Sequence, residues 1–518
     1  MSKNLVAVDR YVKTPAGQAT VREKLPSIQA GAKMHLPSVM TIVASDAPTN
    51  LFRNNGAKYR FQLNRGVFTS AHNLVLRFGI TINTAACVIV PTPFWFDRID
   101  VRLNSDNTTL ATSYSDTLMF NILSRASYAQ ATSLFRNLNI GDGANGPRLG
   151  LTNSLAVGTY YFELPLTSSF FSNADFLFSR SEQDLILELT PSSGIISSGA
   201  GSVDLSSLSL IVETAIRPQQ ELVALEKSFA QSIHSTRYLD IVPVSSYSRA
   251  LAGGTTTKID LQNLSGHCAF MVMCVRNTSA SNTSNGQFKL LDLGAGTVDL
   301  VNESSQSVLG MGSALPLQYV RNMLPVYHMN SDVLANKAYY LIPFCENIRA
   351  AFDGVIDGCQ RFTGSNMQLA VTPATAVQEV QTLTLSAAAA SGSYRLAFNG
   401  EMTGNLLYNA TPATIQSALA ALPYFARYNI TCVVSAALSA GTTVTFTFTC
   451  PERGLEGNTI GVVPNALQSS APAIITFATA RTTPGVQGID AGNYDVTILA
   501  YLYKHLSMFK GRFQAALL

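Results

Sequence analysis

The sequence predicts an all-β protein in which two β sandwiches or barrels follow one another along the chain, with a further β-rich domain inserted in the second. Three observations lead to this prediction. The chain has 518 residues, more than one ordinary domain holds. Strand-length apolar segments alternate with Thr-, Ser-, Asn- and Gly-rich connections throughout. An ordered set of sequence matches recurs roughly 180 to 200 residues downstream.

Composition excludes several classes of protein. Charged residues make up 13% and hydrophobic residues 47%, the reverse of what intrinsic disorder requires. No apolar run approaches the roughly 18 residues of a membrane-spanning helix, and the first residues lack the apolar core of a signal peptide. A chain with so little charge must bury apolar surface, and wide subunit interfaces are the natural place for it.

Strand patterns dominate the first half. Residues 58–63 and 94–103 alternate with period two, and residues 73–82 are mostly apolar and β-branched. Helical patterns are few and short. We expect helices at 115–123, at 219–233 after Pro218, and at 411–422, where Thr411 is placed to cap the helix and Pro412 occupies its first position. Many strands with few short helices are typical of an antiparallel β sandwich or barrel.

The internal repeat fixes the organisation. Tyr160-Tyr161 leads to Pro165 and Thr190-Pro191, as Tyr339-Tyr340 leads to Pro343 and Thr372-Pro373. Further matches keep the same order: 59–62 with 259–262, 73–82 with 268–275, 94–103 with 288–293, 115–123 with 317–324, and 205–216 with 494–508. One order, at similar offsets for all but the last match, favours a duplication, with two unrelated β domains of similar texture as the alternative.

The repeat predicts domain boundaries. We expect an N-terminal arm at 1–33, a first copy at 34–216, a linking helix at 217–237 and the first part of a second copy at 238–379. Residues 380–487 have a different character, with several strands around one helix, and we expect them to be an inserted domain. Residues 488–518 then supply the final strand of the second copy and a tail.

No motif predicts catalysis, a metal or a cofactor. The six histidines show no HxxxH spacing, and no local carboxylate pair is present. Gly294-Ala295-Gly296 lacks the third glycine and long helix of a dinucleotide loop, so a turn is favoured. Trp95, between Phe94 and Phe96, is expected to pack in a core or interface. We therefore expect no enzyme, although carboxylates distant in sequence can meet in a fold.

The seven cysteines contain no CxxC pair, and their odd number argues against a full disulfide framework. Most lie in apolar strands and are expected to be small buried side chains. Cys432 and Cys450 flank one predicted hairpin, with an offset register, so their pairing stays open. Synthesis in a reducing compartment is expected.

Positive charge is concentrated at the N-terminus. Residues 1–33 hold six basic residues against Asp9 and Glu23, while the whole chain has a net charge of only +3. One interpretation is a solvated arm. The other is an arm that contacts anionic lipid headgroups or packaged nucleic acid, without sequence-specific recognition, through Lys3, Arg10, Lys13, Arg22, Lys24 and Lys33.

Consecutive barrels of about 170–180 residues, a linking helix, a large insertion and few charges resemble the double jelly-roll major capsid proteins of icosahedral viruses, often with an internal membrane, such as tectivirus-like bacteriophages and adenovirus hexon. The resemblance covers residues 34–373 and 489–518. The inserted segment resembles small Ig-like or β-rich decoration domains of phage structural proteins.

The resemblance implies a structural virion protein, assembled in the host cytoplasm. In that family three chains stand six jelly rolls upright, so that a homotrimer has a pseudo-hexameric footprint. The implied partners are neighbouring capsomers, penton and minor capsid proteins, and an internal membrane reached by the arm. No cofactor is implied. The insertion would project outward, and it leaves open binding of a host receptor or glycan.

Two other functions remain as alternatives. The first is a receptor-binding or spike protein of a virion, with the inserted domain as a lectin-like module, although no fibrous stem repeat is evident. The second is a carbohydrate-active enzyme on a β sandwich, which a deep acidic cleft would favour.

Overall fold

The computed structural model describes most of the chain. The described residues are 8–13, 19–23, 38–44, 58–63, 69–103, 108–125, 140–143, 146–170, 185–192, 196–199, 201–215, 227, 234–261, 263–277, 290–309, 312–329, 338–364, 367–428, 430–449, 458–471, 473–509 and 512–517.

The first jelly roll consists of two facing antiparallel sheets, with strand orders β3-β14-β5-β11 and β4-β12-β7-β8. Alternate residues of β5, from Leu74 to Ile82, point into the core between the sheets, as period-two alternation predicts. The strands are β3 (Ser38–Ala44), β4 (Tyr59–Leu63), β5 (Thr69–Asn83), β7 (Phe96–Leu103), β8 (Thr109–Tyr114), β11 (Gly158–Pro165), β12 (Leu185–Pro191) and β14 (Ser202–Ala215).

The second jelly roll has the same wiring, with strand orders β15-β31-β17-β20 and β16-β22-β18-β19. In both copies the sequence-order positions of the eight strands are identical, which confirms the internal repeat. β21 adds to β17 and β32 adds to β31. The strands are β15 (His234–Leu251), β16 (Thr257–Asp260), β17 (Ser265–Asn277), β18 (Thr297–Val301), β19 (Leu315–Pro316), β20 (Tyr340–Pro343), β21 (Gln360–Thr363), β22 (Gln368–Thr372), β31 (Gly492–Phe509) and β32 (Arg512–Leu517).

One predicted correspondence is wrong. Residues 288–293 were expected to match the aromatic-led strand β7, but the strand in that position is β18, because β18 pairs with β22 as β7 pairs with β12. The described residues 290–293 form no strand. Leu291 instead donates to the carbonyl of Val275, and Leu293 to the hydroxyl of Tyr340. Their apolar side chains fill the core as an irregular segment.

Short helices follow the equivalent strands β8 and β19. In the first copy this is α2 (Ser115–Arg125), and in the second it is the π-helical turn η3 (Tyr319–Met323) followed by α6 (Leu324–Met329). The 3-10 turn η1 (Thr92–Trp95) precedes β7, and α7 (Ile348–Phe352) follows β20. The predicted linking helix lies outside the described residues except for the helical Lys227.

Between β22 and β31 the chain forms a separate unit with its own hydrophobic cluster. Its sheets have the orders β27-β28-β23-β30 and β25-β24-β26, with β29 added to β24. Thr411 accepts a hydrogen bond from the Thr414 amide and caps α8, as predicted. The elements are β23 (Glu379–Leu385), β24 (Ser393–Phe398), β25 (Glu401–Met402), β26 (Leu406–Leu407), α8 (Pro412–Ala420), α9 (Pro423–Tyr428), β27 (Cys432–Val434), β28 (Thr443–Phe448), β29 (Gly461–Asn465) and β30 (Phe477–Thr483).

The two connections to this unit form a narrow neck. Thr375 bridges Ile489 in parallel, and Val377 bridges Val486 in antiparallel fashion. Glycine is required beside the neck, because a Cβ on Gly294, which has a φ of +72°, would collide with the carbonyl of Gln487. The predicted turn at Gly294 therefore holds the neck against the second jelly roll.

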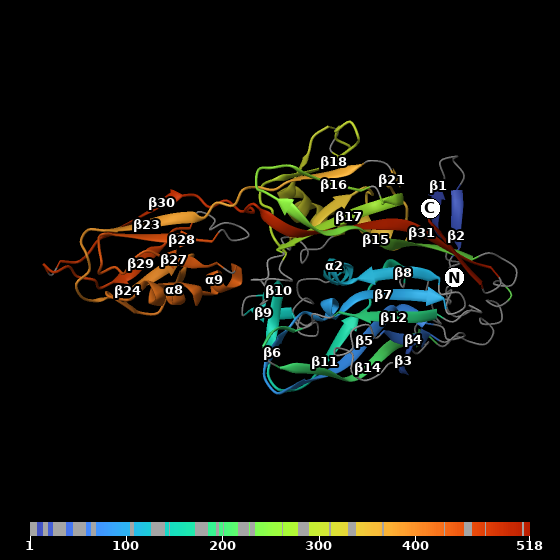
Figure 1. Ribbon diagram of the computed structural model, residues 1–518, viewed down its shortest axis with the longest axis horizontal. Helices are drawn as coiled ribbons and strands as arrows, with labels where there is room; N and C mark the ends of the chain where they lie inside the picture. Colours follow the sequence, from blue (N-terminus) through green and yellow to red (C-terminus); the bar gives the residue numbers. More distant parts are fainter. Residues whose placement is uncertain are drawn as a thin grey trace, which may run out of the picture.

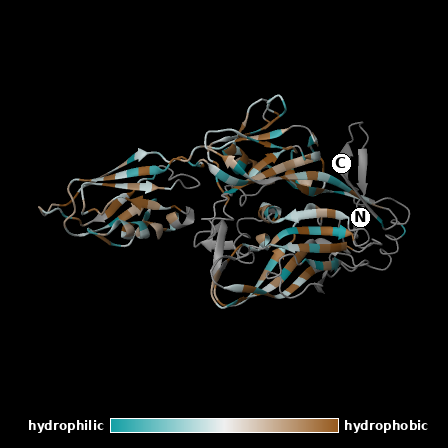
Figure 2. Ribbon diagram, in the orientation of Figure 1, coloured by the Kyte–Doolittle hydropathy of each residue, from teal (hydrophilic) through white to brown (hydrophobic). Residues whose placement is uncertain are grey.

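The inserted unit lies at one end of the molecule's long axis, beyond both jelly rolls, and the hairpin of β1 (Val8–Lys13) and β2 (Ala19–Glu23) lies toward the other end (Figure 1). Hydrophobic and hydrophilic residues alternate along many of the strands (Figure 2), and the buried hydrophobic residues form one cluster in the two jelly rolls and another in the inserted unit. A small sheet of β13 (Ile196–Gly199), β6 (Cys87–Ile89), β10 (Gly146–Leu155) and β9 (Ile140–Gly143) completes the first copy.

Candidate functional site: the interface between the two jelly rolls

The central strand of the second jelly roll is apolar on both faces. Every residue of β17 from Cys268 to Val275 is buried. Since successive side chains point to opposite faces, one set fills the core of the second jelly roll. The other set, which includes Phe270 and Arg276, faces the first jelly roll. A single hydrophobic cluster consequently runs through both copies.

Helix α2 of the first jelly roll fills this second face. All its residues from Thr117 to Ser124 are buried, so it is covered on every side. The Phe120 ring lies 5.5 Å from that of Tyr339, 6.0 Å from Tyr501 and 6.2 Å from Phe270, and Phe270 stacks on Tyr501 at 4.1 Å. Such a buried aromatic cluster anchors an interface strongly.

Polar pairs fix the orientation of α2. Arg276 forms an ion pair with Asp116, and its guanidinium lies 5.5 Å from the centre of the Phe94 ring. Burial alone would lower the pKa of Arg276, but the adjacent Asp116 carboxylate raises it above its ordinary value, so the guanidinium stays charged. The Tyr501 hydroxyl donates to Asn121 Oδ1 over 3.1 Å. The largely buried ion pair and this hydrogen bond link α2 to β17 and β31 of the second jelly roll.

A second set of contacts joins the same two bodies farther along. Ser169 Oγ donates to the Phe352 carbonyl over 2.6 Å and accepts from the Leu239 amide over 2.9 Å. The Tyr238 hydroxyl donates to the Leu110 carbonyl over 2.6 Å. Lys504 Nζ lies 3.1 Å from Asp240 and also donates to the Leu110 carbonyl. Contacts at separate points prevent rotation of one jelly roll against the other.

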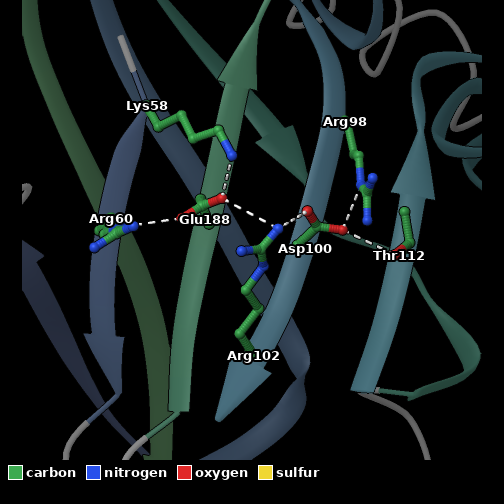
Figure 3. A network of polar contacts seen from close by, with 7 residues as sticks. All are labelled: Lys58, Arg60, Arg98, Asp100, Arg102, Thr112 and Glu188. Atoms are coloured by element: carbon green, nitrogen blue, oxygen red, sulfur yellow. Dashed lines mark hydrogen bonds and ion pairs between the residues drawn. The ribbon is translucent and has the colours of Figure 1, made fainter. Parts of the chain in front are cut away.

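A charge ladder covers the outer face of β4, β12 and β7 in the first jelly roll (Figure 3). Glu188 and Asp100 each retain 1% side-chain exposure, because flanking cations cover them. Burial alone would raise the pKa of Glu188, but the hydrogen bond from Lys58 and the charge of Arg102 lower it below the ordinary 4.5. The other members are Arg60, which binds Glu188, and Arg98, Arg102 and Thr112, which bind Asp100.

The predicted basic arm is only partly described. Arg10 and Lys13 lie in β1 and Arg22 lies in β2, where Arg10 is paired with Arg22 in the antiparallel register. Lys3, Lys24 and Lys33 lie outside the described residues, as do the side chains of all six. The hairpin brings two of the predicted cations side by side at backbone level.

Other predicted features have structural roles. Trp95 is fully buried in the first jelly roll, where its indole donates to the Val90 carbonyl over 2.6 Å, so the prediction of core packing is confirmed. Cys432 is a buried free thiol, and Cys450 lies outside the described residues. Among the described residues, no group of three or more His, Cys, Asp or Glu is arranged to hold a metal ion, and no helix is long and apolar enough to span a membrane.

Sequence reasoning located these strands but missed the interface. The signal was present in the two equivalent strands. Apolar and polar residues alternate in β5, with Arg77 and Thr81 on its outer face. Residues 268–275 of β17, CAFMVMCV, contain no charged or amide side chain on either face. A strand that is apolar on both faces must be covered on both.

The sheets and their shared wiring define a double jelly roll. Among solved structures the chain is similar to VP54 of PBCV-1, whose crystal structure was fitted into a cryo-EM reconstruction of the virophage Sputnik. The similarity has 12% identity and a TM-score of 0.51, and it covers 93% of this chain and 97% of that one. A quasi-atomic model of the PBCV-1 virus capsid matches with the same values.

The mavirus major capsid protein matches with 10% identity and a TM-score of 0.40, over 97% of this chain and 93% of that one. No protein-family model matches the chain, and no curated protein does. The likeness to the PBCV-1 structures, at 12% identity and a TM-score of 0.51, establishes the fold.

Proposed function

We propose that this chain is the major capsid protein of an icosahedral virus. The observation that carries the proposal is the dry, oriented interface by which α2 locks two identically wired jelly rolls together. A shell subunit needs rigid bodies of fixed mutual orientation, because small angular errors would accumulate across a lattice. The likeness to the PBCV-1 capsid structures supports the same role.

The duplication favours a homotrimer. Three chains supply six similar jelly rolls, and these can approximate sixfold packing while the assembly keeps threefold symmetry. Such a pseudo-hexameric capsomer would tile the shell beside penton and minor capsid proteins. Its chemistry is association without substrate turnover, driven by burial of apolar surface.

The positions of the inserted unit and the N-terminal hairpin along the long axis suggest which end of the chain faces out of the virion. The inserted unit and the β1–β2 hairpin lie toward opposite ends of the molecule (Figure 1). We assign residues 380–487 to the outer surface of the virion as a decoration domain between the two parts of the second jelly roll. We assign the arm, 1–33, to the inner surface, where its basic residues meet lipid headgroups or the genome.

Oligomeric state tests the proposal. Size-exclusion chromatography with light scattering should give a mass near three times 55.5 kDa, and electron micrographs of that species should show a hexagonal outline. A chain that stays monomeric at high concentration would contradict it. A reproducible dimer or an extended fibre would contradict it equally.

The arm is tested separately in assembled particles. Reversal of Lys3, Arg10 and Lys13 to Glu should reduce the lipid or nucleic acid content of purified particles severalfold, because counterion release scales with the cations lost. Reversal of the cations Lys258, Arg361 and Arg395 is the matched control and should change neither. Unchanged particle yield and content in the arm variant would refute this role.

A further inference from the structure

The two jelly rolls use equivalent helices in different ways. α2 follows β8, and η3 with α6 follows the equivalent strand β19. α2 is buried on all sides, because its own core covers one face and the second jelly roll covers the other. Among the described residues, the helix of the second copy is covered on one side only, although α6 also approaches α2. Its own core takes up Val320, Arg321 and Leu324, and the opposite face is open to solvent.

The open face of η3 and α6 is an apolar stripe. Tyr319 is 41% exposed, Met323 42%, Val326 42% and Tyr327 69%. Their spacing of four, three and one places them on one side of the helix. Four large apolar side chains gathered in one exposed stripe are typical of an interaction surface.

The stripe is rigidly supported. Arg321, on the buried side of η3, forms an ion pair with Asp292, which also accepts from the Gly294 amide over 2.9 Å. Tyr340 donates to Asp292 over 3.3 Å and accepts from the Leu293 amide over 2.7 Å. A helix held in this way is ordered before any partner arrives, which reduces the entropy lost on binding.

The matching seat is open on the first jelly roll. α2 docks on the outer face of β17 and β31, and the equivalent strands of the first copy are β5 and β14. On that outer face Tyr161 of β11 is 63% exposed and lies across Gly79. Arg77 lies 5.8 Å from the centre of its ring. Here the face that α2 covers in the second copy has no cover in the described chain.

We propose that the η3–α6 stripe of one chain docks on the outer face of β5 and β11 in a second copy of this chain. The contact would use the elements equivalent to those that α2 joins within one chain, on a face that is more polar than that of β17 because β5 carries Arg77 and Thr81 there. It is heterologous, because the two surfaces differ, and successive contacts of this kind close into a ring if the rotation between chains matches that of the proposed trimer. The proposal rests on the proposed capsomer and names the surfaces that hold it together.

The decisive test mixes two variants. Tyr327→Asp blocks the stripe, and Tyr161→Asp blocks the seat. Both side chains are exposed, so each variant should fold, which circular dichroism and thermal melting check. Each alone should be monomeric. An equimolar mixture should give heterodimers that contain one chain of each variant. The Tyr161→Asp chain still has an intact stripe and the Tyr327→Asp chain still has an intact seat, so this is the one contact that can form.

Leu407→Asp is the matched control, since Leu407 is 64% exposed on the inserted unit, and it should assemble as wild type does. Either blocked variant assembling normally would overturn the proposed contact while leaving the capsomer intact. A wild-type chain that does not assemble would instead overturn the proposed function, and the contact with it.

A photo-crosslinker at Tyr327 provides a second measurement that does not depend on how the variants fold. In a mixture of isotopically light and heavy chains, mass spectrometry should find position 327 of a light chain crosslinked to a peptide from β5 or β11 of a heavy chain, and the reverse. Crosslinks between chains that map only to other strands would refute the contact.

Discussion

At the scale of single residues, Phe120 joins the two jelly rolls most directly. Its ring contacts three aromatic rings of the other copy and is fully buried. Phe120→Ala should destabilise the chain by about 3–5 kcal/mol, since it leaves a cavity that the flanking sheets cannot close. Urea unfolding, followed by the fluorescence of the buried Trp95, measures the loss.

Phe425→Ala is the matched control for Phe120. Phe425 is equally buried, but it lies in the separate cluster of the inserted unit. Its loss should destabilise that unit and leave the transition of the jelly rolls unchanged. Equal effects of the two substitutions on Trp95 would contradict separate cores.

The charge ladder predicts a pH dependence. The pKa of Glu188 is lowered in the folded state, so its ionised form stabilises the fold above the ordinary 4.5, and this stabilisation is lost as the pH falls through the lowered pKa. Glu188→Gln should cost about 2 kcal/mol at pH 7. The difference from wild type in chemical denaturation should shrink below pH 4.5.

At the scale of elements, the neck predicts that the inserted unit can be removed. Its hydrophobic cluster is separate from that of the jelly rolls, and the paired Val377 and Val486 bring the two chain ends together. A chain with residues 378–485 replaced by a short Gly-Ser linker should keep its oligomeric mass and lose no more than a few degrees in Tm.

The excised piece supplies the control. Residues 378–485 expressed alone should fold cooperatively, because β23 and β30 pair with each other and share a core with α8. Collapse of the shortened chain together with a folded excised piece would mean that the insertion stabilises the second jelly roll.

Sequence patterns predicted the elements well where local chemistry decides. Thr411 and Pro412 define the start of α8, and alternation defines β4 and β7. The repeat predicted the second copy and the position of β31, which follows more than a hundred residues after β22, the preceding strand of that copy in the sequence. The error at residues 288–293 has a physical reason. A short apolar run buried as an irregular segment has the same composition as a strand, and only its hydrogen bonds distinguish the two.

Local sequence patterns could not predict the interface between the two jelly rolls. Asp116 and Arg276 lie 160 residues apart, and nothing local to either indicates the other. Composition did indicate that apolar surface is buried somewhere, and the continuous apolar run of β17 marks the place. The partner of that run, α2, is identified only when the fold brings the two copies together.

At the scale of the whole molecule, the copies have diverged in a complementary way. The second copy has an outer sheet face that is already covered and a helix that is not. The first has a covered helix and an open sheet face. In the described part of the chain an exposed helix face and an exposed sheet face are therefore left, and the proposed contact would pair them head to tail between identical subunits.

The covalent link between the jelly rolls has a kinetic consequence. The contact made by α2 forms as a unimolecular step during folding, at a rate that does not depend on dilution. A six-barrel ring built from unlinked barrels would need five successive encounters, whereas three linked chains need only two. In the proposed trimer the covalent link would therefore lower the protein concentration needed for ring closure and reduce the number of different incomplete assemblies.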